Sequence, residues 1–179
     1  RNEFLADYYR KFLTGPILNV GGGGQKHLLD YLPHERYCEV DIAGTPDVVM
    51  DLDSTFPLPF NDREYETILC TDVLEHLENF HRVFDELLRI SNKHVIISLP
   101  NGLPEARRML SRLKYQGGSN QPGHSTGLYS KFYGLPLEKP VDRHRWFFSV
   151  HDIVYFISQK ATNTDFSIAD QFLIDHSKN

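Results

Sequence analysis

The sequence feature that most constrains the fold is a short apolar run that ends in four consecutive glycines. Ile17, Leu18 and Val20 have the character of a buried strand, and Gly21–Gly24 follow directly. Glycine permits positive φ angles and lets a ligand approach the bare backbone. Residues 25–32 come next, with their leucines at helical spacing. A strand, a glycine loop and a helix in this order predict the start of a nucleotide-binding α/β domain, and a tight structural turn is the alternative.

An acidic residue at the end of the next predicted strand supports the ligand-binding interpretation. Residues 36–42 form that strand, and Asp41 lies 20 positions after Gly21. In nucleotide-binding units an acid at this distance accepts hydrogen bonds from ribose hydroxyls. An ordinary strand-end Asp is the alternative, because Asp is common in turns.

The remaining segments continue an α/β pattern. Only residues 43–47 separate the strand at 36–42 from the strand-like run at 48–51. Adjacent parallel strands need a crossover of about a dozen residues, so the pairing of 48–51 stays open. Ser149 and Asp152 have the spacing of a helix capping box. Further helices are predicted at 3–13, 77–90 and 149–160, and further strands at 65–70, 94–99 and 166–174.

Together these segments predict a single domain over residues 1–179. We expect an α/β fold with a Rossmann-like, mostly parallel sheet and helices on both faces, which makes a three-layer sandwich. Residues 102–145 are irregular and rich in turn-forming residues, which predicts a lid or a substrate-binding insertion.

Composition excludes several other classes of protein. A formal net charge of -5 argues against a broad nucleic-acid-binding surface. No apolar run approaches the length that crosses a membrane, which predicts no membrane association. Cys38 and Cys70 are the two cysteines, and without a Cys-x-x-Cys pair they predict neither a zinc knuckle nor a disulfide scaffold. Free thiols in strand-like runs favour a reducing, cytoplasmic location.

Several of these segments, in the same order, resemble the class I S-adenosylmethionine-dependent methyltransferases, in particular those that act on small molecules. The resemblance extends over residues 15–100 and, more loosely, over 140–158. The matching segments are 18–25, Asp41, Asp51–Leu52, 71–77, 98–101 and 144–149.

This resemblance implies S-adenosylmethionine as the cofactor. Asn19 stands where the family usually has Asp or Glu, and Gln25 stands where its last glycine is usual. The amide of Asn19 can accept a hydrogen bond from the methionine ammonium, but it brings no charge. The residues implied in cofactor binding are Asn19, Gly21, Gly22, Gly23, Asp41, Ile42, Asp51, Leu52 and Thr71.

The implied chemistry needs little more than alignment and a base. A sulfonium methyl is already electrophilic, so the protein must place a nucleophile in line with it and exclude water. For a hydroxyl acceptor a histidine base is the usual choice near neutral pH. We predict His144 and His76 as catalytic residues with Asp72 as the orienting acid, while His124 and Asp142 are the further candidates.

Three alternatives stay open at this point. Asp72, Glu75 and His76, with His124 or His144, resemble the Glu-x-x-Glu-His metal cluster of small-RNA terminal 2′-O-methyltransferases. The same string is common in relatives without metal, and we predict none. The other two are a nucleotide-dependent oxidoreductase and a non-catalytic binding module of the same fold. We expect O-methylation of a small-molecule or sugar-type acceptor, since the aromatic-Pro-Pro-Tyr motif of amino-group methyltransferases is absent.

Overall fold

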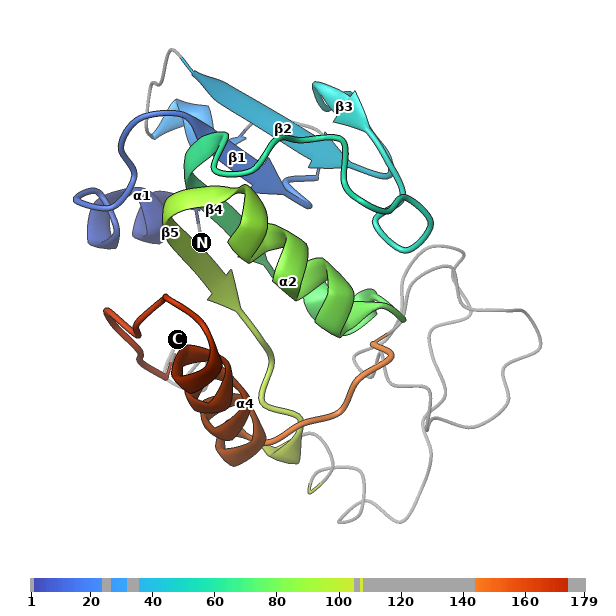
Figure 1. Ribbon diagram of the computed structural model, residues 1–179, viewed down its shortest axis with the longest axis vertical. Helices are drawn as coiled ribbons and strands as arrows, with labels where there is room; N and C mark the ends of the chain where they lie inside the picture. Colours follow the sequence, from blue (N-terminus) through green and yellow to red (C-terminus); the bar gives the residue numbers. More distant parts are fainter. Residues whose placement is uncertain (1, 24–26, 32–35, 105–106, 108–143, 174–179) are drawn as a thin grey trace.

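A computed structural model describes residues 2–23, 27–31, 36–104, 107 and 144–173. Within them, five strands form one parallel sheet in the order β3-β2-β1-β4-β5 (Figure 1). The strands are β1 (Ile17–Val20), β2 (Tyr37–Asp41), β3 (Val48–Val49), β4 (Tyr65–Thr71) and β5 (Ser91–Ser98). The helices are α1 (Asn2–Tyr8), α2 (Phe80–Ile90) and α4 (Val150–Asn163), with the 3₁₀ turns η1 (His27–Asp30) and η2 (Leu74–His76).

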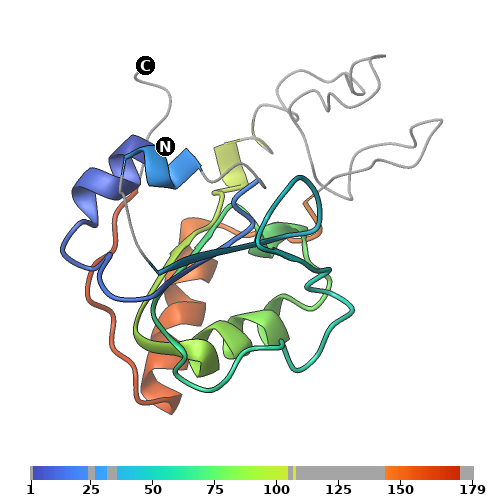
Figure 2. The same ribbon diagram turned by 90° about the horizontal axis from the view of Figure 1, so that it is seen from above.

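Helices cover both faces of this sheet. Figure 2 shows α1 and η1 on one side of it and α2 and α4 on the other. Successive β1 side chains point to opposite faces, so Leu18 and Val20 join the core beneath α2 and α4 while Ile17 joins the core beneath α1. The predicted Rossmann-like α/β architecture with two covered faces is therefore confirmed.

The strand β3 pairs in parallel with β2 despite the short connection between them. Val40 aligns with Val48, and the Asp47 carboxylate accepts the Glu39 N–H at 2.9 Å. A strand of two residues requires the chain to double back only a short distance, and this side-chain hydrogen bond holds the turn. The usual crossover helix is not needed for a pairing this short.

Several predicted elements differ from the structure, including the helix expected over 25–32, whose described residues form the 3₁₀ turn η1. The helix expected over 3–13 ends at Tyr8, and turns carry the chain on to β1. The strand expected over 166–174 is wrong for the described residues 166–173, which form no strand. Phe172 instead packs on α1, with its ring 5.6 Å from Phe4 and 5.0 Å from Tyr8. Aromatic packing rather than pairing with a strand therefore accommodates Phe172, while Ile168 and Leu173 are exposed.

The helix α2 begins three residues later than the predicted helix over 77–90. The Asp53 carboxylate accepts the backbone N–H groups of Glu78 and Asn79, at 3.0 and 2.9 Å. Glu78 and Asn79 therefore belong to the turn before the helix, and the first helical residue is Phe80.

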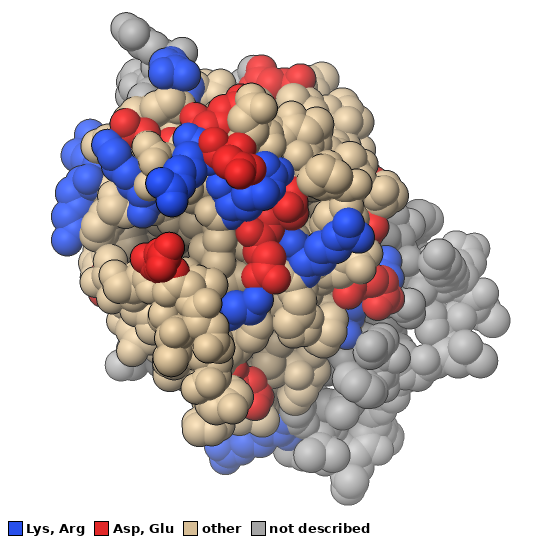
Figure 3. Space-filling model, in the orientation of Figure 1, with Lys and Arg blue, Asp and Glu red and all other residues tan. Residues whose placement is uncertain are grey.

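The surface of the described residues mixes charges of both signs. On the face in Figure 3, lysines and arginines are interspersed with aspartates and glutamates. Ion pairs such as Lys93–Glu66 and Arg89–Asp62 join some of them. None of the helices in the described part has both the length and the apolar character needed to cross a membrane.

Replacement of Ser149 by alanine is expected to lower the free energy of unfolding by about 1 kcal/mol. The Ser149 hydroxyl accepts the Asp152 N–H at 3.2 Å, and the Asp152 carboxylate accepts the Ser149 N–H at 2.7 Å. Urea denaturation measures the loss. Gln159→Ala, at an exposed position of the same helix, is the control and should change stability by less than about 0.5 kcal/mol. Equal effects of the two substitutions would contradict a capping role.

Candidate functional site

The glycine loop after β1 has a conformation that requires glycine. Gly21 and Gly23 have φ angles of 72° and 85°, in the left-handed region. The Gly21 N–H donates to the Val40 carbonyl at 2.7 Å, which ties the loop to β2. A Cβ atom at Gly21 would lie 2.1 Å from Cγ2 of Val73, so the loop also packs closely against the segment after β4.

The carboxylate of Asp41 connects the end of β2 to this loop. Its Oδ2 accepts the Gly23 N–H at 2.8 Å and its Oδ1 accepts the Ala43 N–H at 3.1 Å. Ile42 beside it is 66% exposed. This end of β2 thus presents an acid and an apolar side chain at the carboxyl edge of the sheet, where parallel α/β folds bind ligands.

Two more of the implied cofactor residues follow β3. Asp51 is exposed, and its Oδ1 accepts the Asp53 N–H at 2.9 Å. Leu52 is buried in the core beneath α2. Of this pair, Asp51 offers its side chain to a ligand, whereas Leu52 has only backbone groups to offer.

A small pocket lies where the sheet changes direction. The chain runs outward from β1 to β2 and β3, and then returns to β4 on the other side of β1. Such a switch point is the usual ligand crevice in open α/β sheets. The structure brings Asn19, Gly22 and Thr71 together in the lining of this pocket, with Asn2, Leu5, Leu28 and Leu69. The contribution of α1, through Asn2 and Leu5, was not assigned from the sequence.

A second group beside this pocket was also missed from the sequence. Glu39 is fully buried in β2 and aligns with Asn19 across the strand pair. Its Oε2 accepts hydrogen bonds from the Tyr37 hydroxyl at 2.8 Å and from the Asn19 amide at 3.2 Å. The available signal was its spacing, because residues two apart on a strand share a face and Asp41 lies two positions on.

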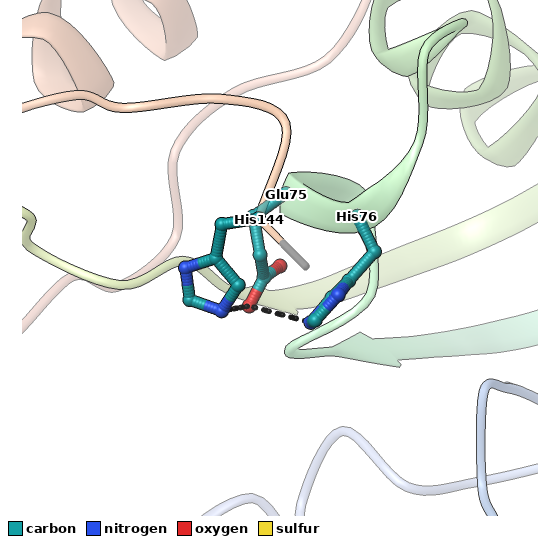
Figure 4. Close-up of side chains that lie close together, drawn as sticks. All are labelled: Glu75, His76 and His144. Atoms are coloured by element: carbon teal, nitrogen blue, oxygen red, sulfur yellow. Dashed lines mark ion pairs between the residues drawn. The ribbon is translucent and has the colours of Figure 1, made fainter. Parts of the chain in front are cut away.

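Two histidines meet at a buried carboxylate beyond β4 (Figure 4). The Nε2 atoms of His76 and His144 lie 3.9 and 4.0 Å from Oε1 of Glu75. The Glu75 side chain is 1% exposed, against 24% and 20% for His76 and His144. The Glu75 carbonyl accepts the backbone N–H groups of Arg145 and Trp146, which brings the distant segment to this turn. The two predicted catalytic histidines are therefore neighbours, with ring centroids 4.7 Å apart.

The acid at this centre is Glu75 and not the predicted Asp72. The Asp72 carboxylate accepts the Ser98 hydroxyl at 2.6 Å and joins the ends of β4 and β5. Asp72 has a φ angle of 57°, a strained value of the kind that clusters at functional sites. Glu75 stood beside His76 in the sequence, but a single 3₁₀ turn is needed to direct its side chain inward.

The sequence matches the methyltransferase domain family over residues 1–155. The chain belongs to the methyltransferase domain family. A comparison with curated proteins found no match. Proteins with this domain are S-adenosylmethionine-dependent methyltransferases in general, so the family confirms the class of enzyme that the sequence motifs predicted. The five-stranded parallel sheet is consistent with the fold of that class.

Three described side chains of this methyltransferase domain have donor atoms of the metal-binding type within 4.8 Å of one another: Glu75, His76 and His144. Two imidazoles and a carboxylate suit several divalent ions. The carboxylate oxygen lies 3.9 and 4.0 Å from the imidazole nitrogens, whereas metal-donor distances near 2.1 Å imply donors about 3 Å apart. The donor types fit a cation, and the donor spacing fits one only after the site contracts.

The structure does not describe all of the residues predicted for this methyltransferase site. His124, Asp142 and Gln25 lie outside the described residues, as does most of the expected insertion over 102–145. Burial raises the pKa of the Cys70 thiol, and the nearby carboxylates of Glu75 and Asp72 raise it further. Cys70 therefore stays a neutral thiol and offers no nucleophile.

Proposed function

We propose that this methyltransferase transfers the methyl group of S-adenosylmethionine to a hydroxyl group of a small-molecule or sugar-type acceptor. The observation that carries the proposal is the meeting of His76 and His144 at the buried carboxylate of Glu75. This centre follows directly after β4, and Thr71 at the end of that strand lines the switch-point pocket.

The cofactor lies along the carboxyl edge of the sheet in this proposal. Asp41 receives the ribose hydroxyls, and the exposed Asp51 and Ile42 are available to the adenine. The switch-point pocket, lined by Asn19 and Thr71, receives the amino-acid end. The bound cofactor supplies an electrophilic methyl group on a sulfonium.

The histidine centre supplies the base. His144 takes the proton of the acceptor hydroxyl through its imidazole, and the Glu75 carboxylate stabilises the imidazolium that forms. His76 shares the same carboxylate and fixes its direction. Asp72 acts indirectly, because its bond to Ser98 holds the ends of β4 and β5 on either side of the acceptor.

Replacement of Asp41 by alanine is expected to abolish micromolar binding of S-adenosylmethionine and S-adenosylhomocysteine in calorimetry. The substitution removes the ribose acceptor and also the hydrogen bond from Gly23. Asp62→Ala, which removes an exposed acid paired with Arg89, is the matched control and should leave both affinities unchanged. If the wild-type protein bound neither ligand, the cofactor assignment would be wrong and the binding-module alternative would gain weight.

The acceptor class is tested by methyl transfer itself. Radiolabelled S-adenosylmethionine is offered with panels of hydroxyl, amine and thiol acceptors, and we expect label on the hydroxyl panel. Removal of divalent cations with a chelator should leave the rate unchanged if the histidines act as a base. A chelator-dependent loss that Mg²⁺ or Zn²⁺ restores would instead assign Glu75, His76 and His144 to a metal centre.

A further inference from the structure

Glu39 is the most deeply buried acid next to the cofactor site, and the proposed mechanism does not use it. Its side chain is fully buried in β2, in register with Asn19 of β1. Only a glycine fits above it, because a Cβ atom at Gly22 would lie 2.3 Å from Glu39 Oε2 and 2.4 Å from Asn19 Nδ2. The Glu39 carboxylate therefore packs closely against the backbone of the glycine loop at Gly22.

Two of the hydrogen bonds that Oε2 of Glu39 accepts come from neutral groups. The Tyr37 hydroxyl donates at 2.8 Å and the Asn19 amide donates at 3.2 Å. Burial, followed by the hydrogen bond to Glu39, raises the pKa of Tyr37, so its hydroxyl remains a protonated donor. A buried carboxylate is stabilised by a cation nearby.

Asn19 links this carboxylate to the pocket. A carboxylate only accepts hydrogen bonds, so the Asn19 atom that faces Glu39 is the amide nitrogen. The same nitrogen donates to the Tyr37 hydroxyl at 2.8 Å. The planar amide then directs its oxygen away from Glu39, and Asn19 lines the pocket together with Gly22. That oxygen is polarised by the buried carboxylate behind it and can accept from a cationic donor.

The position of the pocket determines which part of the cofactor would lie beside Asn19 and Glu39. Asp41 lies on β2 and the histidine centre follows β4, with β1 between those two strands. A cofactor that reaches from Asp41 to the histidines must place its sulfonium and ammonium groups beside Asn19. We infer that Glu39, acting through Asn19, is the positioning residue that selects the cationic amino-acid end of S-adenosylmethionine. This inference rests on the proposed cofactor site.

The pairing of Asn19 with Glu39 across the two strands also accounts for the neutral residue at position 19. With Glu39 directly opposite, an Asp at that position would place two carboxylates side by side, which disfavours the charge of both. The facing pair Asn19–Glu39 thus combines one carboxylate, on β2, with one amide, on β1. The double variant Asn19→Asp/Glu39→Gln moves the carboxylate to position 19 and the amide to position 39. It keeps the net charge of the pair and one amide that can donate to one carboxylate.

Calorimetry with two ligands tests the inference without an activity assay. S-adenosylhomocysteine carries the ammonium, whereas 5′-methylthioadenosine keeps the adenosine and the thioether but lacks the amino-acid end. Glu39→Gln should weaken S-adenosylhomocysteine binding about 10- to 100-fold and change methylthioadenosine binding less than about threefold. The exchange variant Asn19→Asp/Glu39→Gln should restore S-adenosylhomocysteine affinity to within about tenfold of wild type. Glu66→Gln, on β4 and paired with Lys93, is the control and should change neither affinity.

Two further results keep the test decisive. If Glu39→Gln does not fold, the wild-type protein is titrated with the S-adenosylhomocysteine analogue that lacks only the α-amino group. We expect that analogue to bind at least about tenfold more weakly than S-adenosylhomocysteine. Equal affinity for the two, or an equal loss of both ligands in Glu39→Gln, would overturn the role of Glu39 and leave the cofactor site intact. Failure of the wild type to bind either adenosine ligand would overturn the cofactor site as well.

Discussion

Substitution of His144 by alanine is expected to lower kcat about 100-fold or more, because general-base catalysis contributes at least this much when the base is correctly placed. His144 Nε2 lies 4.0 Å from the buried carboxylate of Glu75, which favours the imidazolium that forms during proton transfer. The affinity for S-adenosylhomocysteine should stay within about threefold, because His144 is not among the cofactor contacts proposed here. Single-turnover methyl transfer and calorimetry measure the two quantities separately.

The histidine neighbours provide the controls for this prediction. His151→Ala, at an exposed position of α4, should leave kcat unchanged. His76→Ala should lower kcat as well, and the double variant His76→Ala/His144→Ala should lose little more than the worse single variant, because the two imidazoles act on one carboxylate. A wild-type kcat in His144→Ala would show that His144 is not the general base. Additive losses would indicate two independent roles.

Replacement of Gly22 by alanine is expected to weaken S-adenosylhomocysteine binding at least about tenfold and to lower stability by about 1–3 kcal/mol. The added methyl group would lie 2.3 Å from Glu39 Oε2 and 2.4 Å from Asn19 Nδ2, well inside van der Waals contact. Either the loop or this side-chain pair must then move, and Asn19 and Gly22 both line the pocket that we propose for the cofactor. Calorimetry and thermal unfolding report the two effects.

Gly23→Ala is the matched control for Gly22→Ala. Nothing lies within 4 Å of a Cβ atom at Gly23, but its φ angle of 85° strains any other residue. This control should lose about 1–2 kcal/mol of stability from backbone strain and keep most of the ligand affinity. Wild-type affinity in Gly22→Ala, or the larger affinity loss in Gly23→Ala, would show that close packing at Gly22 is not what shapes the pocket.

Much of the fold was predictable because local patterns and long-range packing agree. The apolar run before the glycines is β1, and alternate side chains of that strand enter the two cores as a period of two requires. The capping box of Ser149 and Asp152 is present as predicted, since it depends only on residues three apart. These features are decided within a few residues of chain, so sequence spacing is sufficient to find them.

The predicted strand at 166–174 is wrong over its described residues 166–173 for the opposite reason. A strand needs a neighbouring edge, and the sequence alone does not reveal which surface will receive a late apolar segment. In the structure Phe172 packs on the rings of Phe4 and Tyr8 instead. The short β3 is the converse case, where a pairing that chain length disfavoured is held by the hydrogen bond of Asp47 to β2.

For the candidate site, the sequence by itself identified the glycine loop, Asp41, His76 and His144 as candidate functional residues. Their residue types and their order along the chain are sufficient to suggest their chemistry. Only the tertiary structure decided that Glu75, and not Asp72, is the acid between His76 and His144. Only it placed the buried Glu39 behind Asn19. The roles proposed for both acids depend on burial and on contacts between separate strands and turns. These are properties of the packed chain rather than of any local spacing.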